Sequence, residues 1–265
     1  MSALRVAVQG LGVWTPQLGN VDALRALLAG EAVSAPPARP GAATLPPNER
    51  RRAPESVLLA TEVADQAVAM SGRMASELAC VFTSSHGDQA ITDYMCATLA
   101  ATPTELSPTK FHNSVHNAPV GYWTIATGCH AASTAVCAHT HSFGAGLLEA
   151  VSLVLADQRP ILLVCSDIAG SGPLAEVTGC TQSFGAAMVL APAAVDTALA
   201  TLSLQLSPAE DLTAASLPEP LATWRAGNPA ARALDLLVPL LRREAQARVA
   251  ASPSMELHLD MEYPG

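Results

Sequence analysis

The hydrophobic positions of the chain fall into short continuous runs and longer helical repeats. Residues 4–10 alternate and are rich in β-branched side chains, which predicts a strand entering a glycine-rich turn. Residues 56–70 carry apolar side chains at helical spacing and predict an amphipathic helix. Apolar runs predict buried strands at 77–83, 161–166 and 186–191. Strands of this kind alternating with helices indicate an α/β domain with a largely parallel sheet, covered on both faces.

Weaker patterns supply the remaining elements. In the first two thirds of the chain, the pattern also predicts helices at 90–101, 118–127 and 143–156. It predicts a strand-like segment at 133–138. The tail predicts a strand, a linker loop, a helix and a last strand at 199–206, 207–228, 229–249 and 255–260. Pro239 lies inside this predicted helix and is expected to kink it.

The composition narrows the classes of function. Half of the 265 residues are apolar, 14% are charged, and the mean hydropathy is +0.29. We expect both a surface buried against a partner and close packing of small residues. The net charge of −9 argues against nucleic-acid binding and against independent binding of an acidic carrier protein, because like charges repel.

The six cysteines form no CxxC pair, so no zinc site is expected. Most lie in or beside apolar segments, as reduced thiols do in the cytosol. The N-terminus has no basic segment followed by a long apolar stretch, and the most apolar run, around 161–165, is too short to span a bilayer. The expected location is therefore the cytoplasm.

Several segments follow one another in the order found in a known family. The segments 5–20 and 27–31 contain a strand, a Gly-Leu-Gly turn, a proline and a helix ending in Gly-Glu. A Ser-Pro loop that leads into an Asn-containing helix follows at 107–123, and glycine- and alanine-rich segments follow at 142–150 and 183–190. Together these resemble the β-ketoacyl synthases. The Phe-His-Asn-Ser-Val-His-Asn form at 111–117 is similar to a divergent branch with short subunits in type II polyketide systems that make aryl polyenes.

The resemblance implies a thiolase-like fold, which consists of two similar α/β/α halves. It covers roughly residues 4 to 192 and fades beyond them. We therefore expect a complete ketosynthase-like half at 1–195 and a truncated remnant of the second half at 196–265, built as strand, helix and strand.

The family's reaction needs a cysteine at a sharp strand-to-helix turn and two histidines from the second half. The His-Gly-Thr-Gly-Thr and Gly-His motifs that carry these histidines do not occur, and His258 is the one histidine after residue 141. The family's spacing to Glu149 places Thr140 at the turn, and a shift of three residues would place Cys137 there instead. We expect His139, Thr140 and His141 to form a vestigial, non-catalytic turn.

Other interpretations of this turn stay open. Cys137 is either a buried strand thiol or an acyl-accepting nucleophile. A zinc site on His139 and His141 would need two more ligands. A hydrolytic site would use Ser142 or Thr140 with a flanking histidine.

In chain-length-factor subunits of this family, the helix matching 90–101 crosses the dimer and closes the partner's acyl tunnel. That resemblance assigns tunnel roles to Ile91, Tyr94, Met95 and Thr98, which share one helical face. It places Phe111, His112 and His116 at the dimer interface, and Val136 on the strand that joins the two sheets. Ordinary core packing and turn capping are the alternatives at these positions. Arg50–Arg52 is either a solvated cluster or a contact with a partner or carrier protein.

The sequence thus favours a non-catalytic, chain-length-factor-like subunit. It would form a heterodimer, or a higher assembly, with an active β-ketoacyl synthase that makes a polyene or other polyketide acyl chain. The acyl carrier protein would be reached through the partner, and neither a cofactor nor a metal is expected. The alternatives are an atypical condensing enzyme or acyltransferase that uses Cys137, and a stand-alone acyl-binding protein of thiolase fold.

Overall fold

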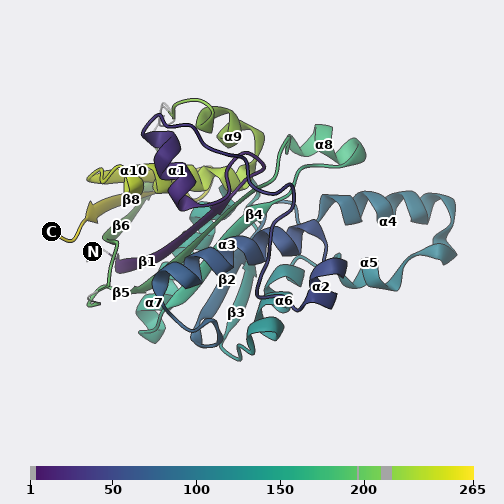
Figure 1. Ribbon diagram of the computed structural model, residues 1–265, viewed down its shortest axis with the longest axis horizontal. Helices are drawn as coiled ribbons and strands as arrows, with labels where there is room; N and C mark the ends of the chain where they lie inside the picture. Colours follow the sequence, from purple (N-terminus) through teal and green to yellow (C-terminus); the bar gives the residue numbers. More distant parts are fainter. Residues whose placement is uncertain (1–3, 196, 210–216) are drawn as a thin grey trace.

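The computed structural model describes residues 4–195, 197–209 and 217–265 (Figure 1). Its eight-stranded sheet has the order β3-β2-β4-β5-β1-β6-β8-β7. The strands are β1 Leu4–Trp14, β2 Ala79–Thr83, β3 Ser133–Val136, β4 Ile161–Asp167, β5 Phe184–Pro192, β6 Ala200–Pro208, β7 Gln246–Ala250 and β8 Met255–Glu262.

The α-helices are α1 Val21–Leu28, α2 Pro47–Arg52, α3 Glu55–Ser71, α4 Gln89–Ala101, α5 Pro108–His112, α6 Ala118–Thr127, α7 Ser142–Asp157, α8 Gly172–Thr178, α9 Leu221–Gly227 and α10 Leu234–Leu241. Short 3-10 turns are η1 Ala75–Glu77, η2 Pro103–Glu105, η3 His139–His141 and η4 Pro229–Ala233.

The sheet is mixed, so the prediction of a largely parallel sheet is wrong. Only β2 with β3 and β2 with β4 are parallel pairs within the described sheet, and the other neighbours run antiparallel. The prediction that both faces of the sheet are covered is confirmed. The sequence pattern carried no information on strand direction, because a buried strand has the same apolar run in either orientation.

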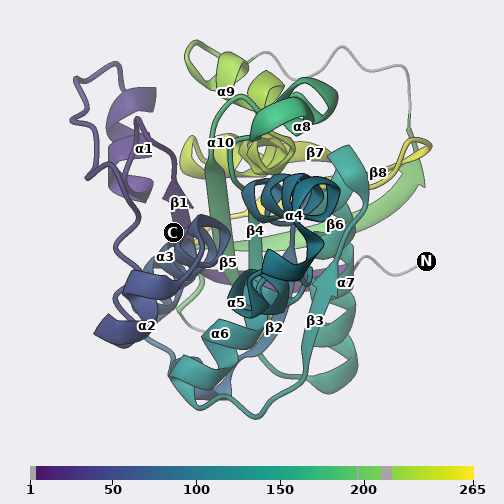
Figure 2. The same ribbon diagram turned by 90° about the vertical axis from the view of Figure 1, so that its right-hand side faces the viewer.

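Alternate side chains of each central strand enter two separate cores. In β4, Ile161 and Leu163 pack on one face, with residues of α7 and α10, and Leu162 and Val164 pack on the other, with residues of α3 and α6. Figure 2 shows α3 and α7 on opposite sides of the sheet. The result is a three-layered α/β/α arrangement, as predicted.

Close approach of α3 to β1 depends on two glycines. A Cβ atom on Gly10 would lie 2.0 Å from the carbonyl oxygen of Ala67, and one on Gly12 would lie 2.1 Å from that of Val63. Only glycine therefore permits this spacing between helix and strand. Close packing between α3 and β1 thus explains both glycines of the Gly-Leu-Gly segment, which resembles that of the β-ketoacyl synthases.

The tail continues the same sheet. Strand β6 pairs antiparallel with β1, from Leu4 opposite Leu204 to Val8 opposite Ala200, and β8 and β7 follow. The division expected after residue 195 falls between β5 and β6. Both segments share one core, in which Leu236 and Leu237 of α10 belong to the same apolar cluster as Leu147 of α7.

Two predictions for the tail are wrong. The helix predicted at 229–249 is a 3-10 turn and α10, which ends at Leu241, followed by strand β7. Arg243 has a positive φ of 56° and turns the chain, after which Ala247 and Val249 alternate inward as strand residues do. The predicted loop at 207–228 contains α9, and its residues 210–216 lie outside the described part of the chain. The tail thus has more elements than the expected strand, helix and strand.

Helices α4 and α5 project from the body of the molecule as a hairpin (Figure 1). Only Gln89 and Ile91, at the base of α4, are buried. No residue of α5 is buried. This projection and the end of the body beneath it hold most of the residues predicted as tunnel or interface residues.

Candidate functional site

The turn between β3 and α7 is sharp, and it centres on His139. The backbone of His139 has a positive φ of 50°, a conformation that non-glycine residues rarely adopt. Its side chain is exposed, while Thr140 and His141 are half-buried. The strained position is thus one residue before Thr140 and two residues after Cys137.

Two serine hydroxyls hold the turn in place. The Oγ of Ser85 and the Oγ of Ser142 donate to the carbonyl oxygen of His139, at 2.6 and 2.7 Å. The amide of Ala138 donates to Ser142 Oγ at 3.0 Å. Ser142 is 1% exposed, so its hydroxyl is a structural cap rather than an accessible nucleophile. The Oγ1 of Thr140 lies 3.3 Å from Nδ1 of His141.

Below the turn, the buried carboxylate of Asp167 organises the loop after β2. It accepts hydrogen bonds from Ser84 Oγ at 2.7 Å and from the amides of Ser85 and His86 at 2.9 and 3.2 Å. Burial raises the pKa of Asp167, and these donors act in the opposite direction. The sequence analysis missed Asp167, although an acid that ends an otherwise apolar strand is a readable signal.

The tail contributes directly to this network. Nδ2 of Asn228 donates to the backbone carbonyls of Asp167 and Gln182, at 2.9 and 2.7 Å. Asn228 is 1% exposed and precedes η4. The tail therefore buttresses the turn, a role that its predicted place in a linker loop did not suggest.

His86 and His139 face each other across the turn. Their rings meet edge to face with centroids 5.6 Å apart. Burial lowers the pKa of His86, Asp167 raises it, and His139 lowers it further. Its Nε2 is buried and has no hydrogen-bond partner in the described structure. The net effect favours the neutral imidazole of His86.

Cys137 lies at the end of β3 and not at the strained position. Its Sγ donates to the carbonyl oxygen of Ser85 at 3.4 Å, and the side chain is exposed. Helix α7 begins five residues later, at Ser142. A cysteine nucleophile of this family needs the N-terminus of the following helix or a neighbouring base to become a thiolate. The arrangement around Cys137 supplies neither in direct contact among the described residues.

On α4, the predicted tunnel residues lie on the less exposed face. Ile91 is buried at the base, and Tyr94, Met95 and Thr98 are half-buried. The hydroxyl of Tyr94 accepts a hydrogen bond from the amide of Ser107 at 3.1 Å. Nζ of Lys110 lies 4.2 Å from the centre of the Tyr94 ring. Tyr94 thus fastens α4 to the returning segment of its own hairpin.

The loop residues predicted at the interface separate into two places. Nε2 of His116 is 2.9 Å from the carbonyl oxygen of Ser84, which brings His116 next to the turn. Phe111 is 59% exposed, and His112 lines a groove of about 520 Å³ on the outer side of α5 and α6. Val136 is half-buried on β3, the strand at the end of the sheet.

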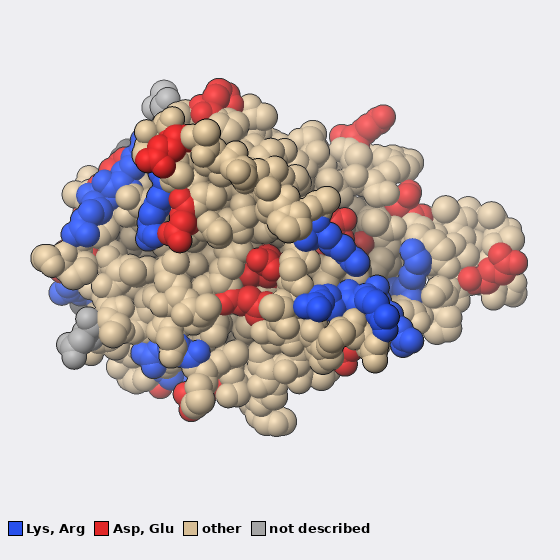
Figure 3. All heavy atoms as spheres, in the orientation of Figure 1, with Lys and Arg blue, Asp and Glu red and all other residues tan. Residues whose placement is uncertain are grey.

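Basic side chains gather beside this groove. Arg50, Arg51 and Arg52 form the last turn of α2, and Arg52 is one of the groove's lining residues. Figure 3 shows one group of Lys and Arg side chains right of centre and others at the left-hand end, while most of the face is uncharged. The two Arg side chains at 51 and 52 are exposed, so the cluster is free to meet a partner.

Within the described residues, no group of three or more His, Cys, Asp or Glu side chains is placed to hold a metal ion. His139 and His141 therefore lack the further ligands that a zinc site needs. The same residues contain no helix long and apolar enough to cross a bilayer.

The structure resembles solved ketosynthase complexes along its whole length. The ketosynthase ApeO in complex with its chain length factor ApeC, from Xenorhabdus doucetiae, matches at 23% identity with a TM-score of 0.71, over 98% of this chain and 99% of that one. The ishigamide ketosynthase/chain length factor matches at 13% identity and a TM-score of 0.74, over 98% and 99%. The AntDE:AntF complex, a type II polyketide synthase carrier protein with its ketosynthase, matches at 13% identity and a TM-score of 0.73, over 100% of both chains.

These neighbours confirm the predicted thiolase-like fold. No curated protein sequence matched the chain. The family model described as the N-terminal domain of β-ketoacyl synthase matches residues 26–255, most of the chain. The chain therefore belongs to the β-ketoacyl synthase N-terminal domain family.

Proposed function

We propose that this chain is a chain-length-factor-like subunit, which does not catalyse condensation itself and forms a heterodimer with an active ketosynthase. The observation that carries the proposal is the strained turn before α7, where an imidazole, that of His139, takes the place of a thiol. Two of the structural neighbours are described as a ketosynthase together with a chain length factor, which supports the same pairing of subunits here.

The chemistry of the turn supports a non-catalytic role. Condensation needs a thiolate to hold the acyl chain and two further imidazoles to assist loss of carbon dioxide. The one histidine of the tail, His258, lies on β8 and is bound through Nε2 to the carboxylate of Glu256. Its position on a strand beyond β6 keeps it in a separate network from the turn.

The apolar surface supports an obligate partner. Among the residues that the structure describes, five of the eight exposed large apolar side chains belong to α4, α5, α6, α8 and the turn between α5 and α6: Leu99, Phe111, Val115, Ile125 and Val177. Their exposed fractions reach 83%, which is costly for an isolated chain. A partner that encloses the projecting hairpin would bury these side chains together.

The end strand of the sheet supports the place of assembly. β3 pairs with β2 on one side, and its other side is the end of the sheet. An unpaired strand edge favours the addition of a second strand. In our proposal β3 of this chain meets the matching strand of the ketosynthase, so that one sheet runs through both subunits.

The product would be a polyene or other polyketide acyl chain, held on a carrier protein that reaches the pair through the ketosynthase. The assembly would work in the cytoplasm. An atypical condensing enzyme that uses Cys137 is the second candidate, because the thiol is exposed.

The two candidates differ in one measurement. The isolated chain, incubated with malonyl carrier protein, is expected to release no carbon dioxide above background. Cys137→Ala in the reconstituted pair should leave turnover within about a few-fold of the parent, because the partner holds the nucleophile. Cys96→Ala, at another exposed thiol, is the matched control. Carbon dioxide release by the isolated chain that disappears in Cys137→Ala but not in Cys96→Ala would establish the enzyme instead.

A further inference from the structure

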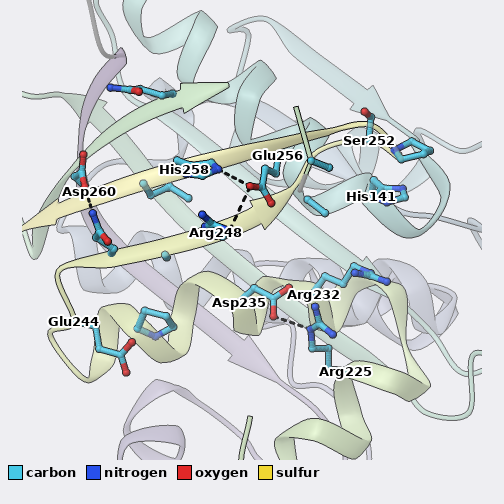
Figure 4. Close-up of a pocket in the computed structure, with 18 residues that line it drawn as sticks. His141, Arg225, Arg232, Asp235, Glu244, Arg248, Ser252, Glu256, His258 and Asp260 are labelled. Atoms are coloured by element: carbon cyan, nitrogen blue, oxygen red, sulfur yellow. Dashed lines mark hydrogen bonds and ion pairs between the residues drawn. The ribbon is translucent and has the colours of Figure 1, made fainter. Parts of the chain in front are cut away.

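A second site lies on the tail, away from the projecting hairpin. It is a cavity of about 810 Å³ between α10, β7 and β8, and its wall includes η4, Arg225 of α9 and His141 of η3 (Figure 4). Its lining is dominated by charged and polar side chains. Neither the proposed assembly nor the turn's network accounts for this cavity.

At one end of the cavity, two guanidinium groups lie near one carboxylate, and only one of them binds it. Arg225 binds Asp235 in bidentate fashion, with Nε to Oδ1 at 2.7 Å and Nη2 to Oδ2 at 2.9 Å. The side chain of Asp235 is 5% exposed and that of Arg225 is 20% exposed. Asp235 is thus fully engaged by Arg225. Arg232 is the second arginine at this end of the cavity, as Figure 4 shows.

The guanidinium of Arg232 makes no hydrogen bond or ion pair with any side chain in the described part of the protein. Burial lowers its pKa, Arg225 lowers it further, and only Asp235 acts in the opposite direction. A half-buried cation without a partner of its own is unfavourable, and an anion beside it removes that cost.

The other carboxylates of the lining are occupied elsewhere. Glu256, 1% exposed, is bound by His258 and lies 3.8 Å from Arg248. Glu244 lies 3.8 Å from Arg242, and Asp260 accepts a hydrogen bond from Gln246 at 2.9 Å. Each acid therefore has a partner other than Arg232, and the end of the cavity at Arg232 keeps an excess of positive charge.

His141, on the facing wall of the cavity, is also affected by the positive charge of Arg232. Burial lowers its pKa, and Arg232 and then His139 lower it further. The guanidinium of Arg232 and the imidazole of His141 line the same cavity, from η4 and η3. These groups suit a small oxyanion, because a guanidinium fork donates two hydrogen bonds and an imidazole donates a third.

We propose that this cavity is a binding site for a small anion with carboxylate or phosphate oxygens, held by the guanidinium of Arg232 with His141 on the facing wall. The occupied site would also touch the turn, because His141 belongs to η3, which directly precedes α7. Ligand binding on the tail would thereby affect the turn before α7, the position that this family uses for catalysis. The proposal does not depend on pairing with a ketosynthase.

The test uses the full chain in a chloride buffer free of carboxylate and phosphate. Inorganic phosphate and acetate are added separately at constant ionic strength, while NMR follows the imidazole signal of His141. We expect a saturable shift with at least one of the two anions, and a higher pKa of His141 in the occupied site. Saturation with phosphate alone indicates a tetrahedral ligand, and saturation with acetate alone indicates a carboxylate.

Arg232→Gln should abolish the saturable shift, whereas Arg25→Gln, which removes an exposed arginine on α1, should retain it. Arg232→Lys keeps the charge but loses the fork, so it should weaken binding by at least about tenfold. This second variant preserves the test if Arg232→Gln does not fold. Shifts that never saturate, or that are equal in the parent and in Arg232→Lys, would overturn the proposal.

Discussion

Three histidines near the turn, His86, His139 and His141, occupy the region where a ketosynthase needs a thiol. The rings of His139 and His86 meet edge to face, and His141 lines the cavity of the tail. For His86 and His141, burial is the main cause of the lowered pKa. The surroundings of the turn therefore favour the neutral imidazoles of His86 and His141, which suits packing and hydrogen bonding better than nucleophilic catalysis.

These lowered pKa values predict how stability depends on pH. In the unfolded chain both imidazoles return to an ordinary pKa of about 6.5. As the pH falls below that value, the unfolded state binds protons before the folded state does. Stability is thus fully present above about pH 6.5 and is lost as the pH falls through the lowered pKa values.

We expect the free energy of unfolding to fall between about pH 7.5 and pH 5.5, and to fall less in the double variant His86→Gln/His141→Gln. Urea unfolding at the two pH values measures this difference. His130→Gln, at an exposed position, is the control and should follow the parent. An equal loss of stability in the double variant would show that other groups carry the pH dependence.

The hairpin of α4 and α5 is the element on which chain length would depend. Its less exposed face carries Tyr94 and Thr98, and its outer face carries Leu99, which is 51% exposed. Because Tyr94 is tied to Ser107 and Lys110, it sets the shape of the hairpin as well as its bulk. A variant at Tyr94 thus changes both the space available and the position of the helix.

Tyr94→Ala is expected to allow longer acyl products in the reconstituted pair, with stability lowered by no more than about 2–4 kcal/mol. Thr98→Phe adds bulk on the same face and should shorten the products. Mass spectrometry of the carrier-bound products measures both effects. Tyr94→Phe keeps the ring over which Lys110 lies and is the matched control, with products like those of the parent. Unchanged products in Tyr94→Ala and Thr98→Phe, with intact complexes, would place length control in the partner.

For the whole molecule, the proposed assembly through β3 is the property to test. Its position at the end of the sheet and its small side chains suit pairing with a second strand. Val136 is half-buried against the core on the side of α7. A charge at this position would be buried without a partner once the sheets join.

Val136→Asp is therefore expected to abolish co-purification with the ketosynthase. Co-expression followed by affinity capture of the ketosynthase measures the amount of complex. Ser152→Asp, on the exposed side of α7, introduces the same charge and should leave the complex intact. Recovery of a stable complex that carries Val136→Asp would place the interface elsewhere.

The sequence determined the longer helices and the strands of the first 192 residues, because burial on one or both faces leaves a periodic apolar pattern. It did not predict the short helices α2, α5 and α8, which bury no residue. It also predicted the turn at 139–141 from the spacing of the residues that resemble the family. The absence of catalytic chemistry stays a prediction. It did not show the direction of β5 or the strand β7, because an apolar run or a short alternation is compatible with more than one direction or element.

Only the tertiary structure placed Asp167, Asn228 and Arg232. Asp167 and Asn228 meet under the turn although 61 residues separate them, and the carboxylate is buried because its donors come from a third segment. Arg232 has no carboxylate partner among the described residues, because its neighbour Asp235 is bound by Arg225. Which side chains far apart in the sequence come into contact depends on the tertiary fold, and no local pattern in the sequence shows it.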